Sequence, residues 1–403
     1  MKKSLVALSV AAISTAAVAQ SNVTIYGTAD VSAQGTSLTA HAAAPGAAVG
    51  SAFNLKANDS SIGFKGTEDL GNGLKALFQA ESYVNLTGGQ QGVATNNGNL
   101  FGNMKDSYVG LNNKYGTVLG GYLSTPYRAT VNSFDVFPGD RSDSVIENVI
   151  GKQRFGYGNG AGATGYVQAD STVRATALAY AMPTLYGVDG SIAYTGSNNN
   201  GTNNQTVNQV GSTTQTTLGL QNAFTFNLGW TGYGVGIKGA FSQAKVNATL
   251  QDSVGATATT PYNGYTSYLV GAQYTGMPGL KVAALYNRNS LGTNAEGNLG
   301  AQKGSNNQVY VGASYRWGNN EPRASYISSS DTSGIQGIGQ DGGTQWNLGW
   351  GYYLSKRTQV YGMVTQYKNN ANGVWAPMQT GTNMLPTGGQ MLTTYGAGLR
   401  TNF

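Results

Sequence analysis

The sequence predicts an all-β fold, a 16-stranded antiparallel transmembrane β-barrel, and three observations carry this prediction. Short segments alternate between apolar and polar side chains, tight and long connections alternate between them, and few residues are charged. Charged residues make up 10% of the 403 residues, whereas roughly 25% is typical of a soluble domain. Alternation with so little charge is typical of strands that have one face in lipid and the other lined by uncharged polar groups.

The N-terminus has the pattern of an export signal. Lys2 and Lys3 precede a short apolar stretch, and Ala17-Val18-Ala19 forms a small-x-small cleavage site. We expect cleavage after Ala19, which divides the chain into a signal peptide, 1–19, and a single barrel domain, 20–403. The apolar stretch is shorter than the ~20 residues that a spanning helix needs. The rest of the sequence has no apolar run of that kind, which leaves strands as the spanning elements.

The last segment shows the alternation most clearly. From Thr393 to Phe403 the odd positions read Thr, Tyr, Ala, Leu, Thr, Phe, and the even positions include Gly, Gly and Arg400. Successive side chains of a strand point to opposite faces. A slip by one residue would move Arg400 into lipid, at a cost of about 2–4 kcal/mol near the bilayer midplane. The hydrophobic pattern therefore specifies the register of this strand.

Sixteen segments follow the same pattern. The predicted strands are 22–33, 52–66, 73–86, 100–112, 116–124, 172–182, 187–196, 219–229, 234–246, 264–275, 279–290, 306–317, 321–330, 344–354, 357–368 and 391–403. The predicted long connections are 34–51, 87–99, 125–171, 197–218, 247–263, 291–305, 331–343 and 369–390. Short turns at one end and long polar loops at the other are the layout of outer-membrane barrels. Rings of 16–18 strands leave an aqueous channel, whereas eight-stranded rings are filled by side chains.

The residue types argue against catalysis and nucleic-acid binding. The chain has no cysteine and a single histidine, His41, which lies in an Ala- and Gly-rich loop without an orienting partner. It has no metal-binding or phosphate-cradling motif and no run of Lys or Arg that would bind phosphates. We therefore expect no enzymatic activity, no cofactor, no metal and no nucleic-acid partner.

Several motifs resemble those of the Gram-negative general porins. They are Asn22-Val23-Thr24-Ile25-Tyr26-Gly27, the stretch 61–81 beginning Ser-Ile-Gly-Phe-Lys-Gly, Tyr108-Val109-Gly110-Leu111, Tyr115-Gly116-Thr117-Val118 and the terminal Phe403. The resemblance implies a homotrimer of 16-stranded barrels in the cell outer membrane, in contact with its lipid and lipopolysaccharide. It also implies passive diffusion of ions and small hydrophilic solutes through each barrel. Tyr395 and Phe403 of the last strand are the residues that we expect to serve barrel assembly.

The resemblance also implies that the third long connection folds inward and narrows the lumen. In the family an acidic patch on this loop faces basic residues on the wall. Here the third long connection, 125–171, is also the longest. The expected constriction-loop residues are Arg128, Asp135, Asp140, Arg141, Asp143 and Glu147. A solvated loop is the plainer interpretation of these charges.

The wall departs from the family pattern. Alternation places Lys65, Lys75, Lys105 and Lys238 on the inner face, opposite in charge to Glu81. The family commonly has arginines where this chain has Ser61, Lys105 and Tyr122, so only Lys105 keeps the charge. We expect Ser61, Glu81 and Tyr122 to line the pore with the four lysines. Because the basic wall is thinned, we predict weak anion preference or near neutrality.

Two further functions remain open. The first is a substrate-selective channel for sugars, phosphate or organic anions, and the second is a non-channel surface barrel that acts as an adhesin or tether. Solute flux separates both from a general diffusion channel, because a tether passes no solute and a selective channel depends on solute identity.

Overall fold

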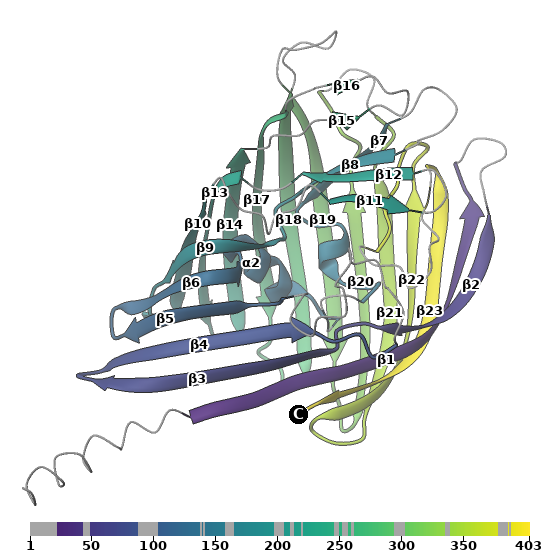
Figure 1. Ribbon diagram of the computed structural model, residues 1–403. Helices are drawn as coiled ribbons and strands as arrows, with labels where there is room; N and C mark the ends of the chain where they lie inside the picture. Colours follow the sequence, from purple (N-terminus) through teal and green to yellow (C-terminus); the bar gives the residue numbers. More distant parts are fainter. Residues whose placement is uncertain are drawn as a thin grey trace, which may run out of the picture.

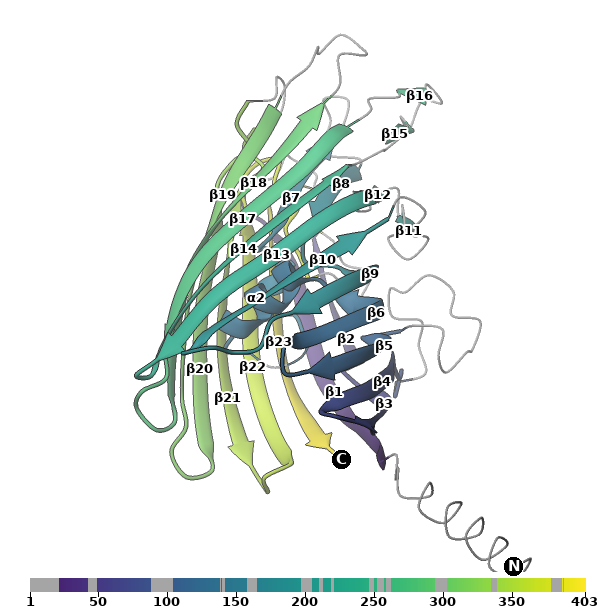
Figure 2. The same ribbon diagram turned by 90° about the vertical axis from the view of Figure 1, so that its left-hand side faces the viewer.

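Antiparallel strands form one closed ring, which Figures 1 and 2 show from two sides. The computed structural model describes residues 22–42, 49–87, 104–137, 139, 142–157, 165–196, 205–209, 213–218, 221–245, 250–251, 257–258, 262–293, 303–334, 339–377, 386 and 388–403. The expected signal peptide lies outside these residues.

The wall strands follow one another around the ring in chain order. They are β1 (Asn22–Ala40), β2 (Gly50–Ala57), β3 (Ser61–Gly71), β4 (Leu74–Tyr83), β5 (Ser107–Asn113), β6 (Gly116–Ser124), β9 (Arg174–Ala181), β10 (Val188–Thr195), β13 (Gln221–Gly232), β14 (Val235–Lys245), β17 (Tyr262–Tyr274), β18 (Leu280–Thr293), β19 (Lys303–Tyr315), β20 (Asn320–Ser329), β21 (Gly343–Tyr353), β22 (Thr358–Asn369) and β23 (Gln390–Asn402). Both β2 and β3 pair with β1, and only residues 58–60 separate them. Counting β2 and β3 as one interrupted wall strand gives the predicted sixteen.

The ring closes between the first and last strands. Strand β1 pairs with β23 from Thr28 opposite Asn402 to Ala40 opposite Gln390. Gly27 and Phe403 exchange backbone hydrogen bonds of 3.1 and 3.0 Å. Closure leaves neither terminal strand with an unpaired edge along the seam, which a bilayer requires.

The two faces of the wall differ as the alternation predicts. Strand β19 is an example of this difference. Val309 and Val311 are exposed, whereas the alternating residues Gln308 and Tyr310 are buried. Tyr315 stacks on Trp317 at the short-turn end, and Trp317 meets Trp350 edge to face, with ring centroids 5.6 Å apart in each pair. Aromatic residues in such a position are typical of the interfacial girdle of outer-membrane barrels. The outer face is therefore apolar and the inner face largely polar.

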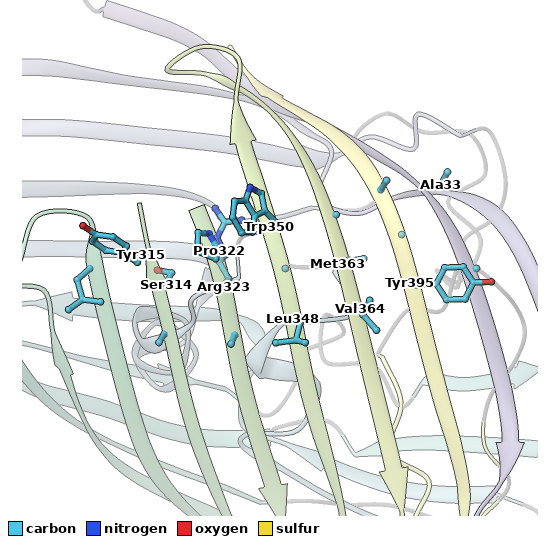
Figure 3. A pocket seen from close by; sticks show the side chains of 18 of the residues that line it. Ala33, Ser314, Tyr315, Pro322, Arg323, Leu348, Trp350, Met363, Val364 and Tyr395 are labelled. Carbon is cyan, nitrogen blue, oxygen red and sulfur yellow. The ribbon is translucent and has the colours of Figure 1, made fainter. Parts of the chain in front are cut away.

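Figure 3 shows an apolar groove of about 930 Å³ on the outer face. Its lining includes small residues such as Ala33 and Ala324 and the larger apolar residues Leu348, Trp350 and Tyr395. Because these side chains belong to the exposed apolar face, the groove is part of the lipid-facing surface and not of the interior.

Several predicted boundaries need correction. Residues 34–40, predicted as loop, continue β1, and β5 begins at Ser107 although the strand was predicted from residue 100. The connections 125–171 and 197–218 also contain strands that the sequence did not predict. These are β7 (Lys152–Tyr157), β8 (Gly165–Asp170), β11 (Gln205–Gln209) and β12 (Thr213–Leu218). They form one four-stranded sheet, which includes a parallel β8–β12 pair. Such pairing joins two connections distant in sequence, and local alternation carries no signal for it.

Two short strands, β15 (Leu250–Gln251) and β16 (Thr257–Ala258), pair in the connection between β14 and β17. The connection between β6 and β9 also holds the α-helix α2 (Pro126–Phe134) and the 3₁₀ helix η2 (Ile146–Asn148). Among the described residues, no helix is both long enough and apolar enough to cross a membrane.

Candidate channel interior

Helix α2 begins the long connection 125–171 with a clear local signal. The Thr125 side chain accepts a hydrogen bond from the backbone N–H of Arg128 at 3.2 Å, and Pro126 occupies the first turn. Threonine as an N-cap and proline in the first turn both favour helix initiation. The helix buries Tyr127, Val131 and Phe134.

These apolar residues dock against apolar residues on the inner wall. Tyr127, Val131 and Phe134 belong to one buried cluster with residues of η2 and its flanks and with wall residues of β14 to β20. Its other members from these elements are Ile146, Val149, Ile150, Ala240, Leu269, Ala283, Leu285, Tyr310 and Ile327. Burying a leucine- or phenylalanine-sized side chain contributes about 1.5–3 kcal/mol. The cluster therefore fastens the loop to this side of the wall.

A set of side-chain amides holds the next part of the loop. The backbone carbonyl of Lys152 accepts hydrogen bonds from Asn289 at 2.9 Å, Asn306 at 3.3 Å and Gln308 at 2.6 Å. Gln308 also accepts from the backbone N–H of Gly151 at 2.9 Å. The Lys152 ammonium pairs with Asp170 at 3.2 Å, and burial lowers its pKa. Side chains of the neighbouring strands β18 and β19 thus bind the backbone carbonyl of Lys152 in the loop.

A third attachment is ionic. Lys56 of β2 forms a buried ion pair with Asp143, whose backbone carbonyl accepts from Gln345 at 3.2 Å and from Tyr367 at 2.6 Å. Asp143 was among the predicted loop residues, but Lys56 was not predicted. Lys56 alternates with exposed Leu55 within β2 and lies on the inner face. In the predicted unbroken strand 52–66 it would share parity with Ile62 and Phe64 of the outer face, so the undetected interruption at residues 58–60 concealed it.

Two other predicted loop residues pair with each other. Arg128 of α2 contacts Glu147 of η2 at 2.6 Å, and both are buried. Arg128 also donates to the carbonyl of Thr172 at 2.7 Å. This pair joins the two helices of the loop, so its charges are largely compensated inside the loop.

Asp135 ties the end of α2 to η2. Its carboxylate accepts hydrogen bonds from the backbone N–H groups of Phe137 at 3.0 Å and Ile146 at 2.9 Å. Burial of the carboxyl group raises its pKa to about 6, against the opposing effects of these hydrogen bonds and of Lys281. The residue as a whole is only half-buried, and it lines the cavity between the loop and the wall.

Asp140 and Arg141, the other two predicted loop residues, lie outside the described residues. Gly139 shows where this part of the loop passes. A Cβ atom at Gly139 would lie 3.1 Å from Nη1 of Arg400 and 3.3 Å from Cβ of Asp59. The loop therefore reaches the charged residues of the wall at this point.

Five charged residues form what we call the wall cluster: Asp30, Asp59, Glu81, Lys105 and Arg400. Lys105 contacts Glu81 at 2.9 Å and Asp59 at 3.2 Å. Arg400 contacts Asp59 at 3.2 Å and Asp30 at 3.3 Å. Three carboxylates thus face two cations, and the cluster carries one net negative charge. Asp59 lies at its centre, in the interruption between β2 and β3.

Tyrosine hydroxyls extend this cluster along the wall. Tyr26 donates to Glu81 at 3.1 Å, and Tyr361 donates to Asp30 at 2.6 Å. The Lys65 ammonium lies 4.8 Å from the centroid of the Tyr26 ring. Ser61 is buried and shares the inner face with Lys65. Of the predicted wall residues, the structure therefore brings Ser61, Lys65, Glu81 and Lys105 to one region.

Lys75 and Lys238 lie elsewhere. Lys75 is next to the turn that joins β3 and β4, and it lies six residues from Glu81, or about 20 Å along a strand. Lys238 pairs with Asp189 at 2.9 Å near another short turn. Both face inward by register, but at the short-turn end of the barrel.

Tyr122 differs from its prediction as a pore-lining residue. The register places it opposite Ser107 and Thr176, on the same face as Gly120 and the exposed Val118. That face is the outer one. The motif resemblance selected this position, whereas its parity with Val118 indicates lipid.

Arg174 is the first residue of β9 and reaches the interior from the strand end. Its Nε contacts Asp106 at 2.8 Å, and its Nη1 donates to the Tyr83 hydroxyl at 3.1 Å. Lys281 and Arg323 are further interior residues that were not predicted from the sequence. Both lie on the inner face and alternate with exposed residues, Val282 and Tyr326 among them, so parity was the available signal.

Comparisons with known proteins agree with this architecture. The family described as "Gram-negative porin" matches residues 5–372. The major outer membrane protein P.IB of Neisseria meningitidis serogroup B is 33% identical over 205 residues, which cover 51% of this chain and 52% of that protein. The protein of the same name from Neisseria lactamica is 28% identical over 361 residues, covering 89% of this chain and 91% of that protein. The first of these matches thus spans about half the length of the relative.

Solved structures with the same fold include an anion-selective porin from Comamonas acidovorans. It is 21% identical with a TM-score of 0.68, and the match covers 95% of this chain and 100% of that chain. OmpF of Salmonella typhi in complex with daunomycin is 18% identical with a TM-score of 0.57, covering 94% of this chain and 97% of that chain. The family match extends over most of the chain, and the chain therefore belongs to the Gram-negative porin family, whose place is the outer membrane.

Proposed function

We propose that this chain forms a water-filled channel through which ions and small hydrophilic solutes diffuse passively across the outer membrane. The observation that carries the proposal is a closed ring of sixteen wall strands with an apolar outer face and a charged, polar inner face. A ring of this size encloses an aqueous channel. Membership in the porin family supports the same conclusion.

Liposome swelling and planar bilayers test the channel. Purified protein should swell liposomes in sugars of small size, with a rate that falls as the sugar grows, and should give discrete current steps. A barrel that inserts but gives neither swelling nor current would contradict the proposal and favour the adhesin or tether alternative.

The proposed constriction lies where the long loop meets the wall. Arg128, Asp135, Asp143 and Glu147, with Asp140 and Arg141 outside the described residues, would narrow the lumen from the loop side. Three attachments support this role: the apolar cluster at α2, the amides around Lys152, and the Lys56–Asp143 ion pair. A loop held at three places would narrow the lumen permanently rather than open and close with voltage.

We also propose a homotrimer that contacts lipopolysaccharide, as the resemblance implies. A fold neighbour, OmpT of Vibrio cholerae, was solved in a trimer form and is 12% identical with a TM-score of 0.59. Current traces test the oligomer, because one inserted trimer should close in three equal steps. Single-step closure throughout would indicate a monomer.

Ion selectivity should be weak. The Comamonas neighbour is titled an anion-selective porin, but the interior of this chain compensates most of its cations. The wall cluster has three carboxylates for two cations, and Lys238, Arg128 and Lys56 each have a carboxylate partner. Reversal potentials in a salt gradient test this, and a strong preference for cations would contradict it.

The proposal also includes cleavage of the N-terminal signal peptide. Export should remove residues 1–19, so N-terminal sequencing of outer-membrane protein should begin at Gln20. We assign no reaction to the chain, because the family and fold imply a channel rather than an enzyme.

A further inference from the structure

Three side chains on neighbouring strands form a lateral row on the inner face. Lys281 of β18 lies opposite Ser314 of β19, and Ser314 lies opposite Arg323 of β20. Directly opposed residues of antiparallel strands project to the same face, with Cβ atoms about 4.5–5.5 Å apart. An ammonium, a hydroxyl and a guanidinium therefore follow one another across three strands. Figure 3 shows Ser314 and Arg323 as neighbours on adjacent strands.

This row lines a cavity of about 430 Å³ between the wall and the long loop. The loop side is formed by residues such as Asn132, Phe137 and Val145. Sites for small molecules occupy about 300–1,000 Å³ and combine an apolar lining with a few converging polar groups. The cavity is of this size, but about half of its lining is polar, which suits a hydrophilic solute better than an apolar one.

The row has hydrogen-bond donors that the protein does not use. Lys281 donates to the carbonyls of Ser133 at 3.0 Å and Asp135 at 2.6 Å, and an ammonium has three N–H groups. Arg323 uses Nη2 for Glu321 at 2.7 Å and for the Tyr353 hydroxyl at 3.3 Å. Within the described part of the chain, Nε and Nη1 of Arg323 and the hydroxyl of Ser314 have no protein partner.

The acidic residues around the cavity are already engaged. Glu321 binds both Arg323 and the Tyr353 hydroxyl, the latter at 2.6 Å. Glu147 pairs with Arg128 at 2.6 Å. Among the described residues no carboxylate lies within ion-pair distance of Lys281. Asp135, the third acidic residue of the lining, attracts Lys281 from beyond ion-pair distance, so one N–H group of Lys281 stays available to a solute.

We propose that Lys281, Ser314 and Arg323 bind the oxyanion of a passing solute, a carboxylate or a phosphate group. The site rests on the proposed channel function, because the solute reaches it through the lumen. Hydrogen bonds from cationic donors to an oxyanion are roughly twice as strong as neutral ones. A hydroxyl between two cations adds a directional donor, so the row distinguishes an oxyanion from a spherical anion such as chloride.

Binding inside a channel should appear as a saturable block of ion current. In planar bilayers with potassium chloride, succinate should lower the conductance along a saturating curve, whereas uncharged succinamide of the same size should not. Lys281→Met should raise the half-blocking succinate concentration about tenfold or more, the value of one charge-assisted hydrogen bond. Ser314→Ala should raise it several-fold.

The two variants separate binding from displacement of the loop. Lys281 also holds the carbonyls of Ser133 and Asp135, so its replacement could move the loop. Ser314 has no hydrogen bond to the part of the loop that the structure describes, so an effect of Ser314→Ala reports the site itself. Lys356→Met is the matched control: Lys356 is exposed in the turn between β21 and β22 at the same end of the barrel. It should leave the half-blocking concentration unchanged.

A second series with inorganic phosphate distinguishes the two oxyanions. Block by both succinate and phosphate, weakened in both variants, supports a general oxyanion site, and block by succinate alone supports a carboxylate site. A block that does not saturate, or that survives both variants, overturns the site while the channel function stands. A protein without ion current would overturn the channel function instead.

Discussion

Lys56 and Asp143 form an ion pair from which water is almost wholly excluded, with side-chain exposures of 0% and 2%. The pair joins the second wall strand to the middle of the long loop, and the other two attachments of the loop lie on β14 to β20. The loop is thus fixed to the wall at separate places. Its position depends on these contacts jointly, which makes each of them testable by substitution.

Lys56→Met should loosen the loop near Asp143. Removing one partner of a buried pair leaves an uncompensated charge, at a cost of about 3–5 kcal/mol. We expect a lower unfolding temperature in detergent and noisier single-channel currents. The double variant Lys56→Met/Asp143→Leu should recover most of the unfolding temperature, because an apolar pair of similar volume is often as stable as the ion pair. Equal behaviour of the single variant and the wild type would show that the pair does not hold the loop.

Asp59→Asn should shift ion selectivity toward anions. Asp59 contacts both Lys105 and Arg400, so the substitution changes the net charge of the wall cluster from one negative charge to zero. Each of the two cations then keeps a single carboxylate partner. A unit charge at contact distance in water-like surroundings is worth about 1 kcal/mol, so the permeability ratio should change several-fold. Reversal potentials measure it. The control is Glu68→Gln, the same charge change at an exposed residue near the β3–β4 turn, which should have little effect.

Lys105→Glu should shift selectivity in the opposite direction, toward cations. The substitution replaces a positive charge by a negative one beside Glu81 and Asp59, so the net charge of the already negative cluster falls by two units. The same reversal-potential measurement applies. An unchanged potential would mean that permeating ions do not pass within range of the wall cluster.

The sequence contained enough to predict the ring. Alternation identified all sixteen wall strands and the two faces, because one buried and one lipid-facing side leave a period-2 pattern. The interruption at residues 58–60 was not predicted, although three consecutive polar residues break the alternation there and at least one would face lipid in an unbroken strand. The strands of the long connections were also missed, because they pair across distant segments and have no lipid face to mark them.

The interior was predictable in part. Parity placed Lys65, Lys75, Lys105 and Lys238 on the inner face, and the same rule applied to every strand would have added Lys281 and Arg323. It would have missed Lys56, because the interruption at residues 58–60 changes the parity between β2 and β3. Which charges meet depends on the register between strands and on where the loop docks. The wall cluster, for example, joins residues of five separate segments, from Asp30 to Arg400. Local sequence patterns contain no information on such contacts between distant charged residues.

The seam between the first and last strands makes a separate prediction about stability. Gly35 of β1 lies under the ring of Tyr395, and a Cβ atom at residue 35 would lie 2.4 Å from that ring. Gly35→Val should therefore displace the ring and destabilise the barrel by about 1–3 kcal/mol, as overpacking does. Gly120→Val is the matched control, because a Cβ atom at residue 120 meets no atom within 4 Å. The unfolding temperature in detergent should fall for the first variant only, and equal values would contradict the packing of Tyr395 on Gly35.

Asp135 predicts a dependence of selectivity on pH. Burial raises the pKa of its carboxyl group from the ordinary value of 3.8 to about 6. The group is thus ionised above pH 6, and as the pH falls through 6 the interior gains one positive charge relative to neutral pH. Anion permeability should rise over this range. The same raised pKa also determines how the stability of the folded chain changes with pH. The folded chain holds this proton more tightly than the unfolded chain, so Asp135 lowers stability as the pH rises from about 4 to 6, and has no such effect below that range. Asp135→Asn cannot titrate, so its reversal potential should lack the step near pH 6 while the steps of other groups remain. A step of the same size in the variant would assign the titration to a different residue.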